Sequence, residues 1–240
     1  MKRALLTVAA LGAVLAASAG AGSDRTTYSC AAGPDVSFRA ADGTKLVGHR
    51  FGSGSTAVVL GHQSQGTLCE WAPYARRLAA RGYFVFAFDF RGHGRSQART
   101  GAPANRLALD VAAAVRNVRA FGKRKVFVVG ASMGGIATLV AGASVQPPVA
   151  GVVAVSAPAR FLGLDAVVSA PRLRAPVLYL AAAGDDNAGY DFSEDAQAMY
   201  ARTASRDKRV AILPGNLHGV ALVGGSARAR SLLEGFLSSR

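Results

Sequence analysis

The chain has 240 residues, half of them apolar, and a formal net charge of +14. This length and composition predict one folded domain with a sizeable core, and they exclude a largely disordered chain. The basic residues are spread over expected helix faces and one loop without interleaved aromatic residues, so we expect no specific nucleic-acid binding. Non-specific attraction to anionic cell-wall polymers or lipid surfaces is compatible with the charge.

The first 19 residues have the pattern of a secretory signal peptide. A positively charged start at residues 1–3 precedes an apolar stretch at 4–17 and small residues at 18–20. A membrane anchor is the competing interpretation, but the apolar stretch is shorter than the roughly 20 residues that a spanning helix needs. We therefore predict cleavage near Ala19, a secreted (extracellular or periplasmic) protein and no transmembrane anchor.

After an N-terminal segment at residues 20–34, the expected domain extends from 35 to 240 and opens with a hairpin. Asp42 and Gly43 lie between two alternating runs, Val36–Arg39 and Leu46–Phe51, and an Asp-Gly pair in that position is a hairpin signal. An antiparallel ribbon is therefore predicted at the start of the domain.

The rest of the domain alternates between expected strands and expected helices. Apolar runs without alternation predict strands buried on both faces: Ala57–Leu60, Tyr83–Phe88, Val126–Val129, Val149–Val155, Pro176–Ala181 and Arg209–Leu213. Helical spacing is found between them and after the last: Trp71–Arg81, Asn105–Phe121, Met133–Ala143, Ser193–Thr203 and Ser226–Leu237. This order predicts an α/β fold with three αβα layers and a mostly parallel sheet of about eight strands. The short interval between Ser156 and Pro176 leaves no room for a large helical cap, so we expect an open site.

Two cysteines, Cys30 and Cys69, are present. In an oxidising compartment they can form a disulfide that ties the N-terminal segment to the domain. Two buried free thiols are the alternative, which spacing alone does not exclude. Neither cysteine has a His or Asp at metal-ligand spacing, and we expect no metal and no cofactor.

Ser132 is the candidate nucleophile, in the run Gly130-Ala131-Ser132-Met133-Gly134. In a chain with 28 glycines the Gly-X-Ser-X-Gly pattern alone is weak. Its context strengthens it, because the serine lies between an expected strand and an expected helix. Such a sharp turn projects the hydroxyl above the carboxyl edge of a parallel sheet, where ligands bind.

A serine nucleophile needs a base, usually an imidazole oriented by a carboxylate. His218 follows the last expected strand and is the preferred base, whereas His49 and His93 are interpreted as structural. The carboxylate is expected in the loop after 176–181, where Asp186 is preferred and Asp185 is the alternate. The order serine, aspartate, histidine is the one that accompanies a nucleophile elbow.

Five segments together resemble the α/β-hydrolase superfamily from about residue 35 to the C-terminus: Ala57–His62, Asp89–Ser96, Gly130–Gly134, Asp185-Asp186 and Leu217–Gly219. The small capless form resembles secreted bacterial esterases and the dienelactone-hydrolase-like branch. Dienelactone hydrolases proper have a cysteine nucleophile, so that substrate is not expected here. The resemblance implies that His62 shapes a loop without reacting, and that the backbone N–H of Met133 forms an oxyanion hole with that of Gln63 or Ser64. Gln63 departs from the family, which has a glycine at this place.

The expected function is therefore a serine hydrolase that cleaves small carboxylic esters through an acyl-enzyme on Ser132. Three alternatives stay open: a peptidase, an extracellular acyltransferase, and a non-catalytic binding protein that kept the fold.

Overall fold

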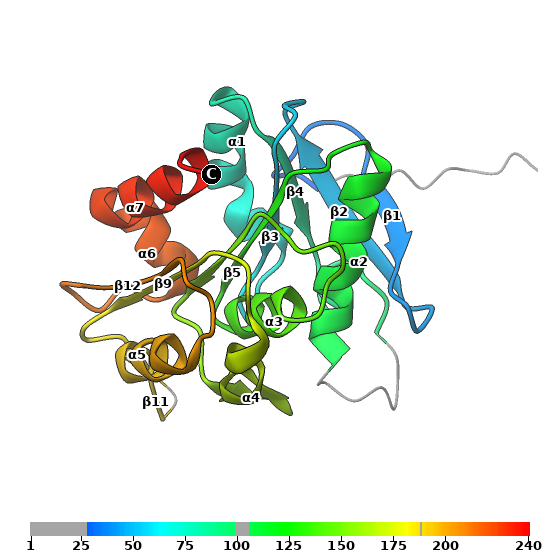
Figure 1. Cartoon of the computed structure of the whole chain (residues 1–240). Helices are drawn as coiled ribbons and strands as arrows, with labels where there is room; N and C mark the ends of the chain where they lie inside the picture. The colour runs from blue at the N-terminus through cyan, green and yellow to red at the C-terminus, as the bar shows by residue number, and fades with distance from the viewer. Residues whose placement is uncertain (1–27, 99–105, 188) are drawn as a thin grey trace, which may run out of the picture.

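The centre of the molecule is one twisted sheet (Figure 1). The structure is a computed structural model that describes residues 28–98, 106–187 and 189–240. The sheet has the strand order β1-β2-β4-β3-β5-β6-β9-β12. Its strands are β1 (Val36–Arg39), β2 (Lys45–Phe51), β3 (Ala57–Gly61), β4 (Phe84–Phe88), β5 (Val126–Ala131), β6 (Gly151–Val155), β9 (Val177–Ala182) and β12 (Lys208–Leu213). Strand β2 is antiparallel to both β1 and β4, and all the other neighbours are parallel.

The five strands at the centre of the sheet are apolar throughout because both of their faces are covered. Every residue of β3, β4, β5, β6 and β9 is buried. Alternate residues of one strand belong to different cores: Val59 packs on one side of the sheet, and Val58 and Leu60 pack on the other. The predicted mostly parallel sheet is confirmed, with strand ends shifted by one or two residues.

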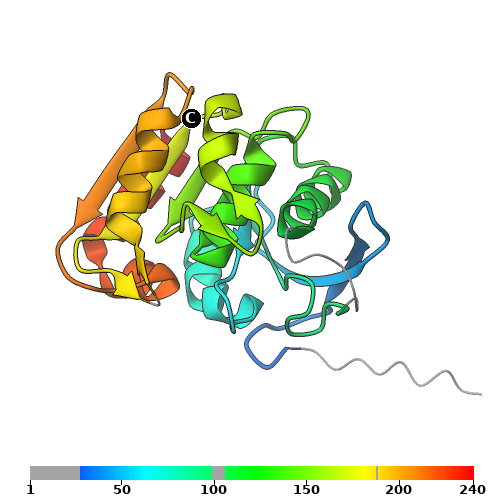
Figure 2. The ribbon, with the colours of Figure 1, turned by 90° about the horizontal axis from the view of Figure 1, so that it is seen from below.

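Helices cover both faces (Figures 1 and 2). One face carries the 3-10 turn η1 (Leu68–Trp71), α1 (Ala72–Ala80), α6 (Gly219–Gly225) and α7 (Ala227–Ser238). The other carries α2 (Leu107–Ala120), α3 (Met133–Gly142) and α5 (Phe192–Arg202). The predicted three-layer αβα architecture is therefore confirmed. The helix expected at residues 226–237 is α7, and α6 before it was not predicted.

Other short elements were also missed. The segment between β6 and β9 contains the hairpin β7 (Arg160–Phe161) and β8 (Leu164–Asp165), followed by α4 (Ala166–Ser169) and the 3-10 turn η3 (Ala170–Arg172). A second hairpin, β10 (Asp186–Asn187) and β11 (Tyr190–Asp191), separates β9 from α5. Elements of two to four residues are too short to show a hydrophobic period.

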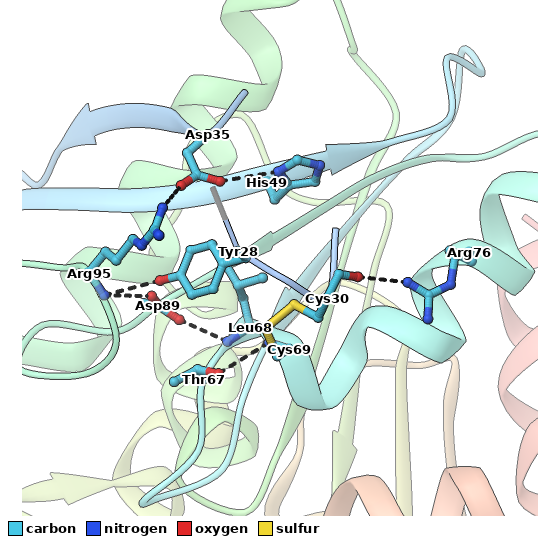
Figure 3. Close-up of a disulfide and its surroundings, with 10 residues drawn as sticks. All are labelled: Tyr28, Cys30, Asp35, His49, Thr67, Leu68, Cys69, Arg76, Asp89 and Arg95. Carbon is cyan, nitrogen blue, oxygen red and sulfur yellow. Dashed lines mark hydrogen bonds and ion pairs between the residues drawn. A yellow bond between two sulfur atoms is a disulfide. The ribbon is translucent and has the colours of Figure 1, made fainter. Parts of the chain in front are cut away.

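The N-terminal part of the described chain lies along β2 and α1 (Figure 3). As expected, Cys30 and Cys69 form a disulfide, with their Cα atoms 5.6 Å apart. The Arg76 guanidinium donates to the Cys30 carbonyl over 2.8 Å, and Arg95 forms an ion pair with Asp35. These contacts fix the segment onto η1, α1 and the loop that follows β4.

The predicted signal peptide at residues 1–19 lies outside the described residues. No helix in the described ranges combines the length and the apolar character needed to cross a bilayer.

Candidate active site

Ser132 lies at the carboxyl end of β5, on the turn into α3. Its backbone has φ 49° and ψ −116°, a conformation that few residues other than glycine adopt. The Ser132 N–H donates to the Val155 carbonyl over 2.8 Å, which ties the turn to β6. The sequence thus predicted the right local structure: a strained strand-to-helix turn with the serine at its apex.

The two glycines of the motif are required by close backbone approach. A Cβ on Gly130 would lie 2.1 Å from the Gly134 carbonyl oxygen, and one on Gly134 would lie 2.4 Å from the Gly61 carbonyl oxygen. Both distances are far below any real Cβ contact. A side chain at Gly130 would therefore collide with the start of α3, and one at Gly134 would push α3 away from the end of β3.

The carboxylate that contacts His218 is Asp185, so the preference for Asp186 as its partner was wrong. The Asp185 Oδ1 lies 2.8 Å from the His218 Nδ1, and the Asp185 side chain is 1% exposed. Asp186 is exposed and begins β10, where it pairs with Asp191 in the hairpin. Because consecutive residues of an extended chain point in opposite directions, only the first of the two aspartates faces the histidine.

Two hydrogen bonds hold the backbone just after His218. The Gly219 N–H donates to the hydroxyl of the buried Ser156 over 2.9 Å, and the Val220 N–H donates to the Gln63 side-chain oxygen over 3.2 Å. The imidazole itself packs against the Phe192 ring, with centroids 4.5 Å apart. Neither Ser156 nor the side chain of Gln63 was singled out for this role from sequence, because a single side-chain hydrogen bond leaves no pattern of spacing.

His62 connects the end of β3 to the loop after β4. Its Nδ1 lies 2.7 Å from the Gln63 carbonyl, and its Nε2 accepts the Phe90 N–H over 3.0 Å. The ring is therefore neutral, with the proton on Nδ1. Complete burial lowers the pKa of His62 to about 4. His62 shapes this loop, as the family resemblance implied.

Glu70 lies under the loop that follows His62. Its carboxyl group contacts Gly66 so closely that a Cβ there would lie 2.3 Å from it, and its Oε2 is buried without a hydrogen-bond partner among the described residues. Burial raises the pKa of Glu70, and the nearby Gln63 N–H opposes that rise.

Strained backbone is found at Ser132 and in three loops. Among the described residues, positive φ outside glycine is found at Gln65, Ser132, Ser156 and Leu162. Gln65 is in the loop after β3, Ser156 follows β6 and bonds the segment after His218, and Leu162 is at the tip of the β7–β8 hairpin. Residues in sparsely populated φ/ψ regions are retained only where the surrounding structure enforces them, and they are common at functional sites.

A cavity of about 100 Å³ brings the candidate residues together. Three polar residues line it: Ser64, Ser132 and His218. Its apolar lining residues are Pro158, Phe161, Tyr190 and Phe192. Candidate nucleophile, candidate base and one of the two candidate oxyanion-loop residues therefore share one small space at the carboxyl edge of the sheet.

The remaining histidines lie in hydrogen-bonded structural positions. The His49 ring lies between the Asp35 carboxylate and the Ala32 carbonyl, and the His93 ring contacts the Arg91 carbonyl within its own turn. In the described part of the chain, no cluster of three or more His, Cys, Asp or Glu side chains is arranged to hold a metal ion.

Solved structures resemble this one over most of its length. An esterase from Pyrococcus furiosus superposes with a TM-score of 0.72 at 21% identity, over 85% of this chain and 91% of that chain. A hydrolase from Pseudomonas aeruginosa PA01 gives 0.73 at 18% identity, over 87% of this chain and 100% of that one. The chain has the α/β-hydrolase fold. A monoacylglycerol lipase from Paleococcus ferrophilus is also similar, with a TM-score of 0.67 at 20% identity, over 81% of this chain and 99% of that one.

One sequence family matches part of the α/β-hydrolase domain. The family described as "Serine aminopeptidase, S33" matches residues 53–165. This segment contains Ser132 and the loop after β3, and it ends before Asp185 and His218. No curated protein matches the chain in sequence.

Proposed function

We propose that the protein is a serine hydrolase that cleaves carboxylic esters through an acyl-enzyme on Ser132. One observation carries the proposal: His218, in contact with the buried Asp185, lines the same small cavity as Ser132. In this assignment His218 is the base, and Asp185 holds its ring in the tautomer with the proton on Nδ1.

The reaction has two halves. The Ser132 Oγ attacks the ester carbonyl carbon while its proton passes to the His218 Nε2. The tetrahedral intermediate then collapses, and the alcohol leaves with that proton. Water attacks the acyl-serine in the same way, giving up a proton to His218, and the carboxylic acid is released as Ser132 regains its hydrogen.

The oxyanion hole pairs the N–H of Met133 with that of Ser64. Met133 is the first residue of α3, where N–H groups have no partner within the helix. Ser64 is favoured over Gln63 because Ser64 lines the cavity and Gln63 does not. These donors meet the charge that develops on the carbonyl oxygen.

The lining of the cavity favours an ester over the substrate of an aminopeptidase. An aminopeptidase binds a protonated α-amine, for which a carboxylate is the natural partner. None of the described residues that line this cavity is Asp or Glu. Similar solved structures include an esterase and a monoacylglycerol lipase, which agrees with ester chemistry.

We propose further that the protein is a small, capless, secreted enzyme. The pattern of residues 1–19 and the Cys30–Cys69 disulfide both favour an oxidising compartment outside the cytosol. Removal of Lys2 and Arg3 with residues 1–19 lowers the formal charge from +14 to +12, which still favours non-specific attraction to anionic cell-wall or lipid surfaces there.

Ser132→Ala tests the assignment. We expect kcat/KM on p-nitrophenyl acetate to fall by about 10⁴-fold or more, as when a nucleophile is removed from other serine hydrolases. Ser205→Ala is the matched control, since Ser205 is also a buried serine but lies just before β12 at the opposite edge of the sheet. A fluorophosphonate probe should label the wild type and the control but not Ser132→Ala. Folded wild type that is neither labelled nor active would favour a binding protein.

A further inference from the structure

The cavity beside Ser132 is small and uncharged. Its volume of about 100 Å³ is well below the roughly 300–1,000 Å³ of pockets that hold drug-sized ligands. A water molecule occupies about 30 Å³ in the liquid, so the cavity accommodates about three to five non-hydrogen atoms. Its walls opposite the polar groups are Pro158 and three aromatic rings.

The aromatic walls form a continuous row that ends on the candidate base. Phe161 and Tyr190 meet edge to face with centroids 6.4 Å apart, and Tyr190 stacks on Phe192 at 5.7 Å. Phe192 in turn packs on the His218 ring at 4.5 Å. Each ring is supported by the next, so the rings form one continuous wall of the cavity.

The outer two rings come from the two short hairpins. Phe161 is in β7 and Tyr190 is in β11, and both side chains are half-buried. Neither carries a hydrogen bond of the candidate active site, whereas Phe192 supports both the His218 ring and, through its N–H, the Asp185 carbonyl. Phe161 and Tyr190 can therefore limit size without taking part in the chemistry.

We propose that this cavity binds the acyl part of the substrate and selects short, uncharged acyl groups of about two to four carbons, with Phe161 and Tyr190 setting the limit. This rests on the proposed esterase function. The limit is steric, since the rings in mutual contact form the wall of a small cavity. No Asp, Glu, Lys or Arg among the described lining residues is placed to hold an acyl group that ends in an amine or a carboxylate.

The test compares p-nitrophenyl acetate, butyrate, octanoate and a hemisuccinate ester. For the wild type we expect kcat/KM to fall at least tenfold from butyrate to octanoate, and the hemisuccinate to react at least tenfold more slowly than butyrate. Phe161→Ala and Tyr190→Ala should each raise the ratio of octanoate to acetate at least tenfold. Leu162→Ala is the matched control, because Leu162 lies on the same hairpin but is 50% exposed and does not line the cavity. Its profile should equal that of the wild type.

Two readouts separate the possible failures. Fluorophosphonate labelling of each variant establishes that the site is folded, and Phe161→Leu provides a smaller change with an intermediate profile if the alanine variant is not labelled. A wild type that is labelled yet cleaves octanoate as fast as acetate would overturn the size limit and leave the serine hydrolase standing. A wild type that is neither labelled nor active on any ester would overturn the function itself. Variants with unchanged profiles would overturn the roles of the two rings.

Discussion

The turn at Gly130–Gly134 and the loops on either side of it are held in different ways. The turn is fixed by backbone lying against backbone, which allows only glycine at two positions. The loop after β3 and the segment after His218 are held instead by single side chains, namely His62, Gln63 and Ser156. Close backbone contact leaves a motif in the sequence. A side-chain hydrogen bond leaves none, since many residue types can make it.

Two adjacent aspartates in the loop after β9 have very different surroundings: Asp185 is buried against His218, and Asp186 is exposed. Asp185→Asn should lower kcat/KM on p-nitrophenyl acetate by about 10³- to 10⁴-fold, because an amide no longer selects the required tautomer of His218. Asp186→Asn, in the exposed hairpin, should change it by less than about threefold. Steady-state kinetics of the two variants decide the point, and equal losses would contradict the assignment of Asp185.

The backbone contacts of the turn can be broken with one methyl group. Gly134→Ala places a Cβ 2.4 Å from the Gly61 carbonyl oxygen, and we expect a loss of about 3 kcal/mol or more in the free energy of unfolding. Gly235→Ala in α7 is the control, since a Cβ there has no atom within 4 Å and should stabilise the helix by about 0.5–1 kcal/mol. Urea unfolding measures both, and equal stabilities would show that the turn tolerates a side chain.

The loop after β3 should lose stability in acid through His62. Its pKa is about 4 in the folded protein, against 6.5 for a histidine in water. Between these two pH values the unfolded chain therefore binds a proton at His62 and the native state does not. Stability should therefore fall as the pH drops from 6.5 to 4, by about 3 kcal/mol from this group at about 1.36 kcal/mol per pKa unit. In His62→Gln that part of the loss should vanish. Urea unfolding at several pH values measures it, and an identical pH dependence in both proteins would contradict the prediction.

The bond from Gln63 to the segment after His218 should give the smallest effect. Gln63→Ala removes the acceptor for the Val220 N–H, and we expect kcat/KM to fall about tenfold, equivalent to about 1.4 kcal/mol. Gln97→Ala is the matched control. The side-chain oxygen of Gln97 also accepts a backbone N–H over 3.2 Å, from Lys45 in β2. Its kcat/KM should stay within about twofold. If both variants behave alike, the contact of Gln63 has no bearing on the position of His218.

The contrast between close backbone contact and single side-chain hydrogen bonds also explains which features could be predicted from the sequence. Buried strands are recognised as unbroken apolar runs and amphipathic helices by their helical period. The sheet, the layers and the setting of Ser132 follow from these two signals. The pairing of Cys30 with Cys69 followed from there being only two cysteines. The choice between Asp185 and Asp186 depended on the direction of one peptide after β9, which neighbouring residues of identical type could not reveal. The two hairpins are too short to have a period, although they form the outer walls of the cavity.

The proposed reacting groups and the proposed size-limiting residues lie on different parts of the chain. The proposed reacting groups sit on the turn after β5 and on the loops after β9 and β12, all anchored in the sheet, whereas the outer cavity walls sit at residues 160–165 and 186–191. Surface hairpins tolerate replacement and lengthening far better than buried strands do. A library confined to the exposed and half-buried residues of these two stretches could therefore alter which esters are accepted, provided that the core residue Leu164 is kept.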